Sequence, residues 1–143
     1  MHSTSEERNV PAIVDGRVTE SRLRFEVGDV CRVEVRVQDV AVAGEGSDLF
    51  EALTAARRGL EARDIQLGCN GARVDVFPSG MLRQAAAGRR AYVLPIPRVT
   101  VKPPLVDIFD LAPEGSNLAT VDEQREFFDR WLHSGPAIEE TSQ

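Results

Sequence analysis

Two neighbouring stretches of the chain alternate apolar and charged side chains, and this alternation constrains the fold more than any other feature. In the first stretch, Leu23, Phe25 and Val27 alternate with charged residues. In the second, residues 33–37, a valine occupies every other position. Because successive side chains of a strand point to opposite faces of a sheet, each stretch predicts a half-buried strand.

The connection between these two strands decides which side chains face each other. A two-residue turn would place Arg32 opposite Phe25, on the apolar side of the sheet. A three-residue connection over residues 28–30 instead places Val33 opposite Phe25. The second register keeps the apolar sides together, and we therefore predict it.

A helix is predicted after the second strand. Apolar residues recur there at helical spacing, namely Leu49, Leu53, Ala56 and Leu60. Ser47 or Asp48 can cap the N-terminus, and Glu51 stands at the third position after Asp48, as in a capping box. The helix therefore presents one apolar stripe to a sheet.

A second helix is predicted over residues 121–133. Thr120 and Glu123 form a capping box at its start. At about 100° per residue, one arc collects Val121, Gln124, Phe127, Phe128, Trp131 and Leu132. This arc predicts the buried face of the helix.

The middle of the chain predicts three further strands. Ile65–Cys69 and Ala72–Phe77 flank Asn70-Gly71, a pair typical of a tight hairpin, because both residues tolerate a positive φ. Ala91–Leu94 predicts the next strand. Met81–Ala87 is compatible either with two helical turns or with a mobile loop, and both interpretations stay open.

Together these segments predict an α+β fold in which an antiparallel or mixed sheet of about five strands carries two helices on one face, in the order β-β-α-β-β-β-α. We expect a single domain over residues 21–134. Residues 1–20 are predicted to be a mobile N-terminal tail, in which Asp15-Gly16 is a weak hairpin signal. Residues 135–143 are predicted to be a C-terminal tail.

Composition limits the cellular setting. At 143 residues the chain has the size of one domain, and no apolar run approaches the roughly 20 residues that span a bilayer. The N-terminal sequence is polar and acidic, unlike a signal peptide, so we expect a cytoplasmic protein with no membrane partner. The only cysteines, Cys31 and Cys69, lie in strand-like segments and are predicted to be reduced and buried.

One segment has a charge opposite to that of the rest of the chain. Residues 70–102 contain six basic residues and one acid, whereas the whole chain has a formal net charge of −6. Clustered guanidinium groups repel one another unless an anion offsets them. We therefore predict a ligand- or partner-binding site at Arg73, Ser79, Arg83, Arg89 and Arg90. The alternative is a solvated basic flap whose arginines pair with the acids of residues 107–114.

Catalytic and metal-binding patterns are not assembled in the sequence. Cys69 is better explained as a buried structural residue than as a nucleophile, because His133 lies at a helix end. Ser79 lacks the surrounding pattern of a nucleophile elbow. The chain has no Cys-x-x-Cys and no paired histidines, and on a strand Asp107 and Asp110 would point to opposite faces. We predict no metal site and no cofactor.

Two binding folds are also disfavoured. The order of elements from residue 47 to residue 133 is similar to that of a double-stranded RNA-binding domain, but residues 121–126 are acidic where that family has lysines. Gly44-Glu45-Gly46 precedes a helix, as a dinucleotide loop does, but lacks the third glycine. We therefore interpret Gly44-Glu45-Gly46 as a plain turn.

Several segments resemble a group of short, uncharacterised bacterial α/β proteins. These segments are Asn70-Gly-Ala-Arg, Pro78-Ser-Gly-Met, Ala91-Tyr-Val-Leu, Val106-Asp-Ile-Phe, and the stretch from Glu123-Gln-Arg to Trp131-Leu. The resemblance covers about residues 20–133 and implies no activity.

Three functional hypotheses follow. The first is a non-enzymatic interaction protein, of the immunity or adaptor type, that binds another protein. The second is a binder of an anionic ligand or of nucleic acid through residues 70–102, although the net charge disfavours nucleic acid. The third, an enzyme, ranks last because the sequence assembles no catalytic group.

Overall fold

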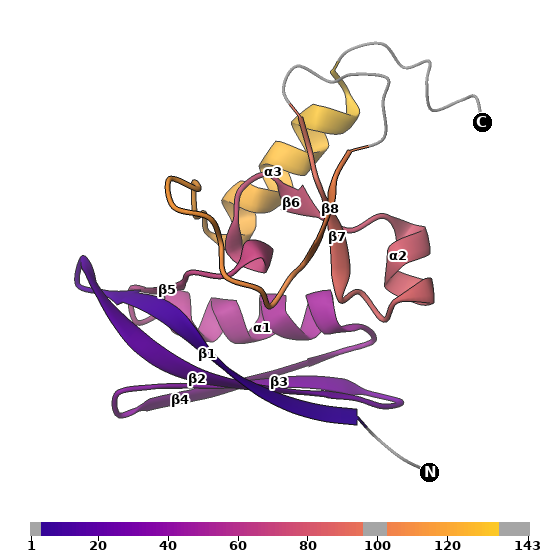
Figure 1. Cartoon of the computed structure of the whole chain (residues 1–143). Helices are drawn as coiled ribbons and strands as arrows, with labels where there is room; N and C mark the ends of the chain where they lie inside the picture. The colour runs from indigo at the N-terminus through magenta and orange to yellow at the C-terminus, as the bar shows by residue number, and fades with distance from the viewer. Residues whose placement is uncertain (1–3, 96–102, 135–143) are drawn as a thin grey trace.

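A five-stranded antiparallel sheet forms the base of the protein. The structure is a computed structural model and describes residues 4–95 and 103–134. Four strands follow one another: β1 (Thr4–Val14), β2 (Arg17–Val27), β3 (Cys31–Val37) and β4 (Val40–Gly46). Helix α1 (Leu49–Glu61) then crosses from β4 to β5 (Ile65–Leu67) at the opposite edge, which gives the order β4-β3-β2-β1-β5 (Figure 1).

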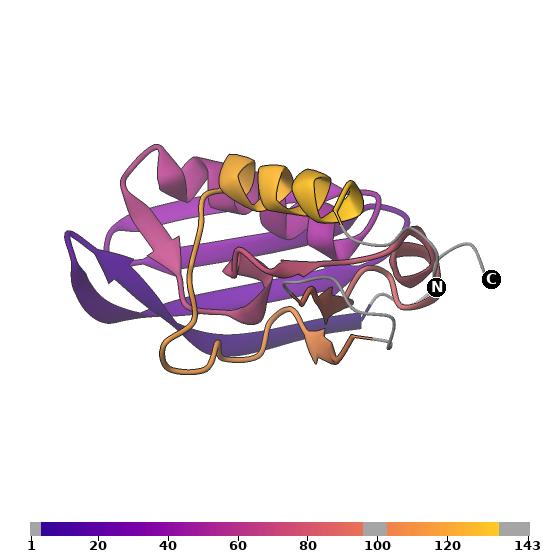
Figure 2. The same ribbon diagram turned by 90° about the horizontal axis from the view of Figure 1, so that it is seen from above.

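The rest of the chain builds a second layer. It contains the 3₁₀ helix η1 (Asn70–Ala72), β6 (Val76–Phe77), α2 (Gly80–Ala85), β7 (Arg90–Val93), β8 (Leu105–Asp107) and α3 (Val121–Leu132). Strands β6, β7 and β8 form a small antiparallel sheet in that order. In the described residues, all of these elements lie on the same side of the large sheet as α1 (Figures 1 and 2).

The inner face of the large sheet forms the core. Alternate residues of β2 and β3 are buried, including Leu23, Phe25, Val33 and Val35. Helix α1 covers the β3–β4 side of this face with its leucine stripe. The segment after β8 covers the β1–β2 side, where the rings of Phe25 and Phe109 stack with their centroids 4.2 Å apart.

The predicted fold class is confirmed: the protein is α+β, and its five-stranded sheet is antiparallel. The predicted order of elements is not, because β1, β4, β8 and α2 are additional and β6, β7 and β8 form a sheet of their own. The predicted register is also confirmed, because Phe25 lies opposite Val33 across a three-residue connection. Asp48 caps α1 by accepting a hydrogen bond from the Glu51 amide, 2.8 Å away. The segment after Ser79 forms helix α2 rather than an irregular loop.

The prediction of an N-terminal tail is wrong for residues 4–20. Residues 4–14 form β1, which pairs along its whole length with β2, and Asp15 and Gly16 make the two-residue turn with positive φ values of 52° and 76°. Of its charged side chains, Glu7 lies on the open face of the sheet. Glu6 and Arg8 lie on the same side as the buried Val10 and Ala12, where they pair with Arg89 and Asp110. Residues 135–143, the predicted C-terminal tail, lie outside the described residues.

The predicted hairpin at Asn70-Gly71 is also wrong. Those residues lie in η1, while β5 pairs with β1 and β6 pairs with β7. The amides of Asn70 and Gly71 donate instead to the carbonyls of Asp110 and Ile108, at 2.8 Å each. A Cβ atom at position 71 would lie 2.5 Å from Leu53 Cδ2, so the glycine serves close packing rather than a turn.

A buried guanidinium group joins the two layers. Arg57 on α1 is 3% exposed and donates to the carbonyls of Gly71 (3.0 Å) and Ala119 (2.7 Å) and to Oε1 of Gln124 (2.7 Å). None of these three acceptors is a carboxylate. Burial lowers the pKa of Arg57 from its ordinary value, partly opposed by nearby Cys69 and Glu61. Gln124 continues the network by donating to the carbonyls of η1 and β6.

Both cysteines are free and buried, as predicted. Burial raises the pKa of the Cys69 thiol, and the neighbouring Arg57 opposes that effect only in part. Cys69 is therefore a neutral core residue. Among the described residues, no helix combines the length and the apolar character needed to cross a membrane.

The capping box of α3 gives a first test of the fold. The Thr120 hydroxyl accepts from the Glu123 amide at 3.1 Å, and the Glu123 carboxylate accepts from the Thr120 amide at 2.9 Å. We expect Thr120→Ala to lower the free energy of unfolding by about 1 kcal/mol, because one amide loses its acceptor. Urea unfolding followed by circular dichroism measures this change; Thr120→Ser, which keeps the hydroxyl, should be nearly neutral.

Candidate interaction surface on the open sheet face

The arginines predicted to form a site in residues 70–102 are mostly paired within the protein. Arg73 donates through Nε and Nη2 to both oxygens of Asp75, at 3.1 Å each, and through Nη1 to Asn70. Ser79 caps α2 by accepting from the Leu82 amide. These two residues hold local structure.

Arg83 anchors α2 to the start of α1. Its Nη1 lies 3.1 Å from Oδ2 of Asp48, the residue that caps α1. Its guanidinium carbon lies 5.2 Å from the ring centroid of Phe50 and 5.6 Å from that of Phe77, within cation–π range. The positive charge of Arg83 is therefore already matched by an acid and two aromatic rings.

Arg89 links β1 of the large sheet to β8 of the second layer. It bridges Glu6 of β1 (2.9 Å) and Asp107 of β8 (2.8 Å), and it lies over the ring of Phe25. Burial opposes its ionisation, but the charges and hydrogen bonds of Asp107 and Glu6 outweigh this effect and raise the pKa of Arg89. Arg90, exposed on β7, makes no ion pair in the described part of the chain.

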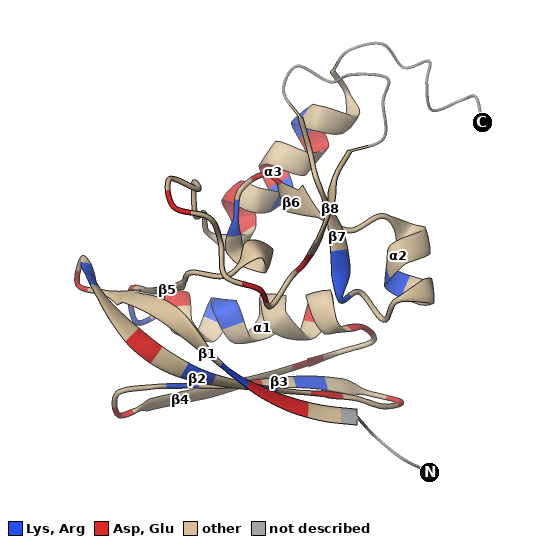
Figure 3. Ribbon diagram, in the orientation of Figure 1, with Lys and Arg blue, Asp and Glu red and all other residues tan. Residues whose placement is uncertain are grey.

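The predicted site residues do not converge. Arg73 lines a hollow beside the loop of residues 113–117, whereas Arg83 lines a groove between α1 and α3. Figure 3 shows basic and acidic positions intermingled over both layers. Arg98 and Lys102 lie outside the described residues. These observations do not favour an anion site in residues 70–102, and they match in part the alternative of internally paired arginines.

The open face of the large sheet carries a different arrangement of charge. In the described residues, no element covers this face (Figure 1). We call it the outer face, and its side chains form rows across β1, β2, β3 and β4. The rows are Ser5–Glu26–Arg32–Glu45, Glu7–Arg24–Glu34–Ala43 and Asn9–Arg22–Arg36–Ala41. The first two alternate in sign, whereas the third brings two arginines together.

Most of the outer-face arginines have an acid nearby. Arg32 donates to Glu34 and Glu45, at 2.9 Å each, and these hydrogen bonds raise its pKa above the ordinary value. Arg22 lies 3.6 Å from Glu7. Arg24 lies 3.5 Å from Glu26. These pairs are exposed, so each contributes little to stability.

Arg36 is the exception. It is exposed, lies directly opposite Arg22, and makes no ion pair within the described residues. Like charges opposite each other across a strand pair are unfavourable. Its neighbour on the other side is Ala41, whose methyl group offers no charge. The third row is therefore the place on this face where positive charge is least balanced.

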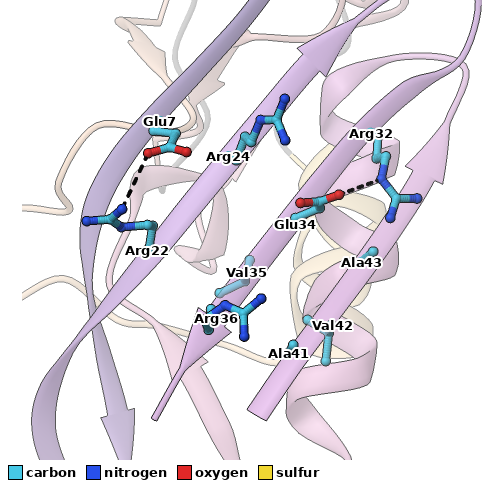
Figure 4. A pocket seen from close by; sticks show the side chains of 10 residues that line it. All are labelled: Glu7, Arg22, Arg24, Arg32, Glu34, Val35, Arg36, Ala41, Val42 and Ala43. Atoms are coloured by element: carbon cyan, nitrogen blue, oxygen red, sulfur yellow. Dashed lines mark hydrogen bonds and ion pairs between the residues drawn. The ribbon is translucent and has the colours of Figure 1, made fainter. Parts of the chain in front are cut away.

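A hollow of about 430 Å³ lies at this place (Figure 4). Four arginines and two glutamates line it, together with two alanines of β4. The charged residues are Glu7, Arg22, Arg24, Arg32, Glu34 and Arg36, and the alanines are Ala41 and Ala43. In Figure 4, Arg36 extends beside Ala41 and Val42 without a dashed contact. A guanidinium group offers several donors in one plane, which suits a carboxylate. The hollow can therefore hold acidic side chains.

The outer face offers no metal-binding set: the described residues contain no cluster of three His, Cys, Asp or Glu side chains able to hold an ion. Arginine does not ligate metals, and the carboxylates of this face bind arginines instead.

The sequence prediction missed this surface for a definite reason. Along the chain, the arginines of β2 and β3 alternate with glutamates, so a running count of charge is near zero there. The pairing of Arg22 with Arg36 appears only when the strands are placed side by side. The predicted β2–β3 register already contained that pairing, and charges read across the strands would have shown it.

Comparison with known proteins adds no assignment. No protein-family model matches the chain, and no curated protein matches it. The resemblance to short bacterial proteins stays a prediction.

Proposed function

We propose that this protein is a non-enzymatic interaction protein, of the immunity or adaptor type, that binds another protein through the outer face. The observation that carries the proposal is the hollow around Arg22 and Arg36, which is lined by four arginines but only two glutamates, with alanines of β4 at one side. A carboxylate from a partner would supply the acid that Arg36 lacks in the described chain.

The pattern of charge favours a protein over a nucleic acid. Glu7 and Glu34 line the hollow, and Glu26 lies in the row beside it; their carboxylates would repel a run of phosphates. The net charge of −6 also disfavours binding of a nucleic acid. A protein surface can place acids opposite the arginines and bases opposite the glutamates, and such matching fixes the orientation of a complex.

A double variant tests the proposal. With the tagged protein as bait in an extract of its native cells, we expect Arg22→Ala/Arg36→Ala to lose a partner that the wild type retains. With that partner purified, titration calorimetry should show a dissociation constant at least about tenfold higher for the variant, a loss of about 1.4 kcal/mol. The wild-type affinity should also fall as salt is raised.

The matched control is Arg63→Ala/Arg130→Ala. Both of these arginines are exposed, and neither makes an ion pair in the part of the chain that the structure describes. The control removes the same charge away from the hollow and should bind like the wild type. If both double variants bind equally well, the outer face is not the binding surface.

A further inference from the structure

Within residues 4–95 and 103–134, strand β4 is an edge of the large sheet and pairs with β3 alone. Val37 and Val40 close a two-residue turn and so form a hydrogen-bonded pair. In an antiparallel ladder, hydrogen-bonded and non-bonded pairs alternate. The amide and carbonyl groups of Ala41, Ala43 and Glu45 therefore point away from β3, towards the free edge.

Within the described residues, this edge lacks several of the usual protections against pairing. Proteins protect exposed edges with charged side chains such as lysine, with proline, bulges or very short strands, or with a covering helix. Here Glu45 is the one charged residue of β4, and α1 lies over the inner face of the strand. Strand β4 has seven residues, Val-Ala-Val-Ala-Gly-Glu-Gly, and its ladder with β3 runs without interruption. Among the described residues, no backbone hydrogen bond to the free-edge groups of Ala41, Ala43 or Glu45 is found. The opposite edge, β5, has only three residues.

We propose that β4 pairs antiparallel with β4 of a second copy of this chain, with Ala43 opposite Ala43 on a two-fold axis. In this register Ala41 of each copy lies opposite Glu45 of the other. All the free-edge groups of Ala41, Ala43 and Glu45 then find partners, because residues at hydrogen-bonded positions face each other. The two sheets become one sheet of ten strands.

Charge complementarity supports the choice of a second copy. The third row of the outer face, which ends in Arg36 and Ala41, would continue with Glu45 of the second copy. Arg36 and that glutamate would be about 10 Å apart between Cα atoms, two strand spacings, with only the Ala41 methyl group between them. Two long side chains span this distance. The self-paired register thus brings an acid near Arg36 in both copies. Glu45 would then accept from Arg36 of the other copy as well as from Arg32 of its own.

The inner face also accepts this arrangement. The register places Val42 of each copy opposite Gly44 of the other, and the glycine has no side chain that could clash with the valine. Ala55 of α1 lies directly over β4, because a Cβ atom at position 44 would be 2.8 Å from the Ala55 Cβ. Gly59 lies over Val42. Both residues are small and leave room beside the new strand.

The proposal goes beyond the proposed function but shares Arg36 with it, because Glu45 of the second copy and a partner's carboxylate would both pair with that arginine. The test is the molar mass of the purified chain by analytical ultracentrifugation over a series of concentrations. We expect twice the 15.7 kDa of one chain at high concentration. Ala43→Lys places two like charges opposite each other on the two-fold axis, and it should raise the dimer dissociation constant at least about tenfold.

The matched control is Ala85→Lys, which adds the same charge at an exposed position of α2 and should dimerise like the wild type. Circular dichroism should show that Ala43→Lys is folded, since Ala43 is exposed in the single chain. Mixing Ala43→Lys with Ala43→Glu should restore a dimer, because lysine then faces glutamate.

Two results would overturn the proposal: a wild-type chain that stays monomeric at every concentration, or an Ala43→Lys variant that dimerises as strongly as the wild type. Neither would count against partner binding, because these variants leave Arg22 and Arg36 unchanged. Conversely, loss of partner binding in Arg22→Ala/Arg36→Ala leaves the mass measurement on the wild-type chain unaffected.

Discussion

Replacement of Arg57 by leucine is expected to lower the free energy of unfolding by about 2–5 kcal/mol, a large part of the 5–15 kcal/mol typical of a domain. The Ala119 carbonyl and Oε1 of Gln124 would each lose the arginine as donor in a buried place. A buried acceptor without a donor costs about 1–3 kcal/mol. Leucine removes the cost of burying a charge, which offsets part of this loss.

Chemical denaturation of Arg57→Leu and Arg58→Leu side by side measures the effect. Arg58 is the next residue of α1, is exposed, and pairs with Asp122 on the surface at 3.0 Å. Its replacement should cost less than about 1 kcal/mol. Equal losses in the two variants would show that Arg57 does not hold the layers together. A loss confined to Arg57→Leu, with a lower midpoint and an unchanged slope, is the expected outcome.

Gly44→Ala is expected to destabilise the protein by about 3 kcal/mol or more, at the upper end of the range for overpacked sites. An added Cβ atom would lie 2.3 Å from the Ala52 carbonyl oxygen and 2.4 Å from the Ala56 nitrogen. Both atoms belong to the backbone of α1 and cannot turn away as a side chain can. The helix must therefore move off β4, which opens the core between them.

The soluble yield and the thermal midpoint of Gly44→Ala report this loss. Gly80→Ala is the matched control, because a Cβ atom at position 80 meets nothing within 4 Å and alanine suits the first turn of α2. The control should be neutral or slightly stabilising. A Gly44→Ala protein that melts like the control would mean that α1 and β4 are less closely packed than the structure indicates.

Local sequence patterns predicted the features that depend on residues close together in the chain. The register of β2 and β3, the Asp48 cap and the capping box of α3 each follow from a few adjacent residues, and all three are confirmed. These features involve short loops, periodic apolar residues and side chains three positions apart. Each of them can therefore be predicted from a single segment of the sequence.

Elements that depend on distant partners were not predicted. Strand β1 has eleven residues but a mostly polar sequence, because one of its sides faces solvent and the other is buried only where Val10 and Ala12 meet the core. Asn70-Gly71 matches a hairpin turn, yet its amides bind a segment almost forty residues later. In both cases tertiary contacts outweigh the local preference.

The candidate site shows the same division between local and distant information. The positive charge of residues 70–102 is evident from the sequence, but the acids that neutralise it, Glu6, Asp48 and Asp107, include two from far outside that segment. Net charge along a segment therefore did not predict where unbalanced charge appears on the surface. The position of Arg36 beside Arg22 depends on strand pairing.

The acceptors of the Arg57 guanidinium group set a limit on how this fold can be divided. The large sheet and α1 are complete by residue 67, so the first half of the chain has the outward form of an autonomous module. The Arg57 side chain of this half, however, donates its hydrogen bonds to Gly71, Ala119 and Gln124, which all belong to the second half. Exchange of the second half for an unrelated sequence would remove these three acceptors, so the packing of α1 depends on segments that follow residue 67.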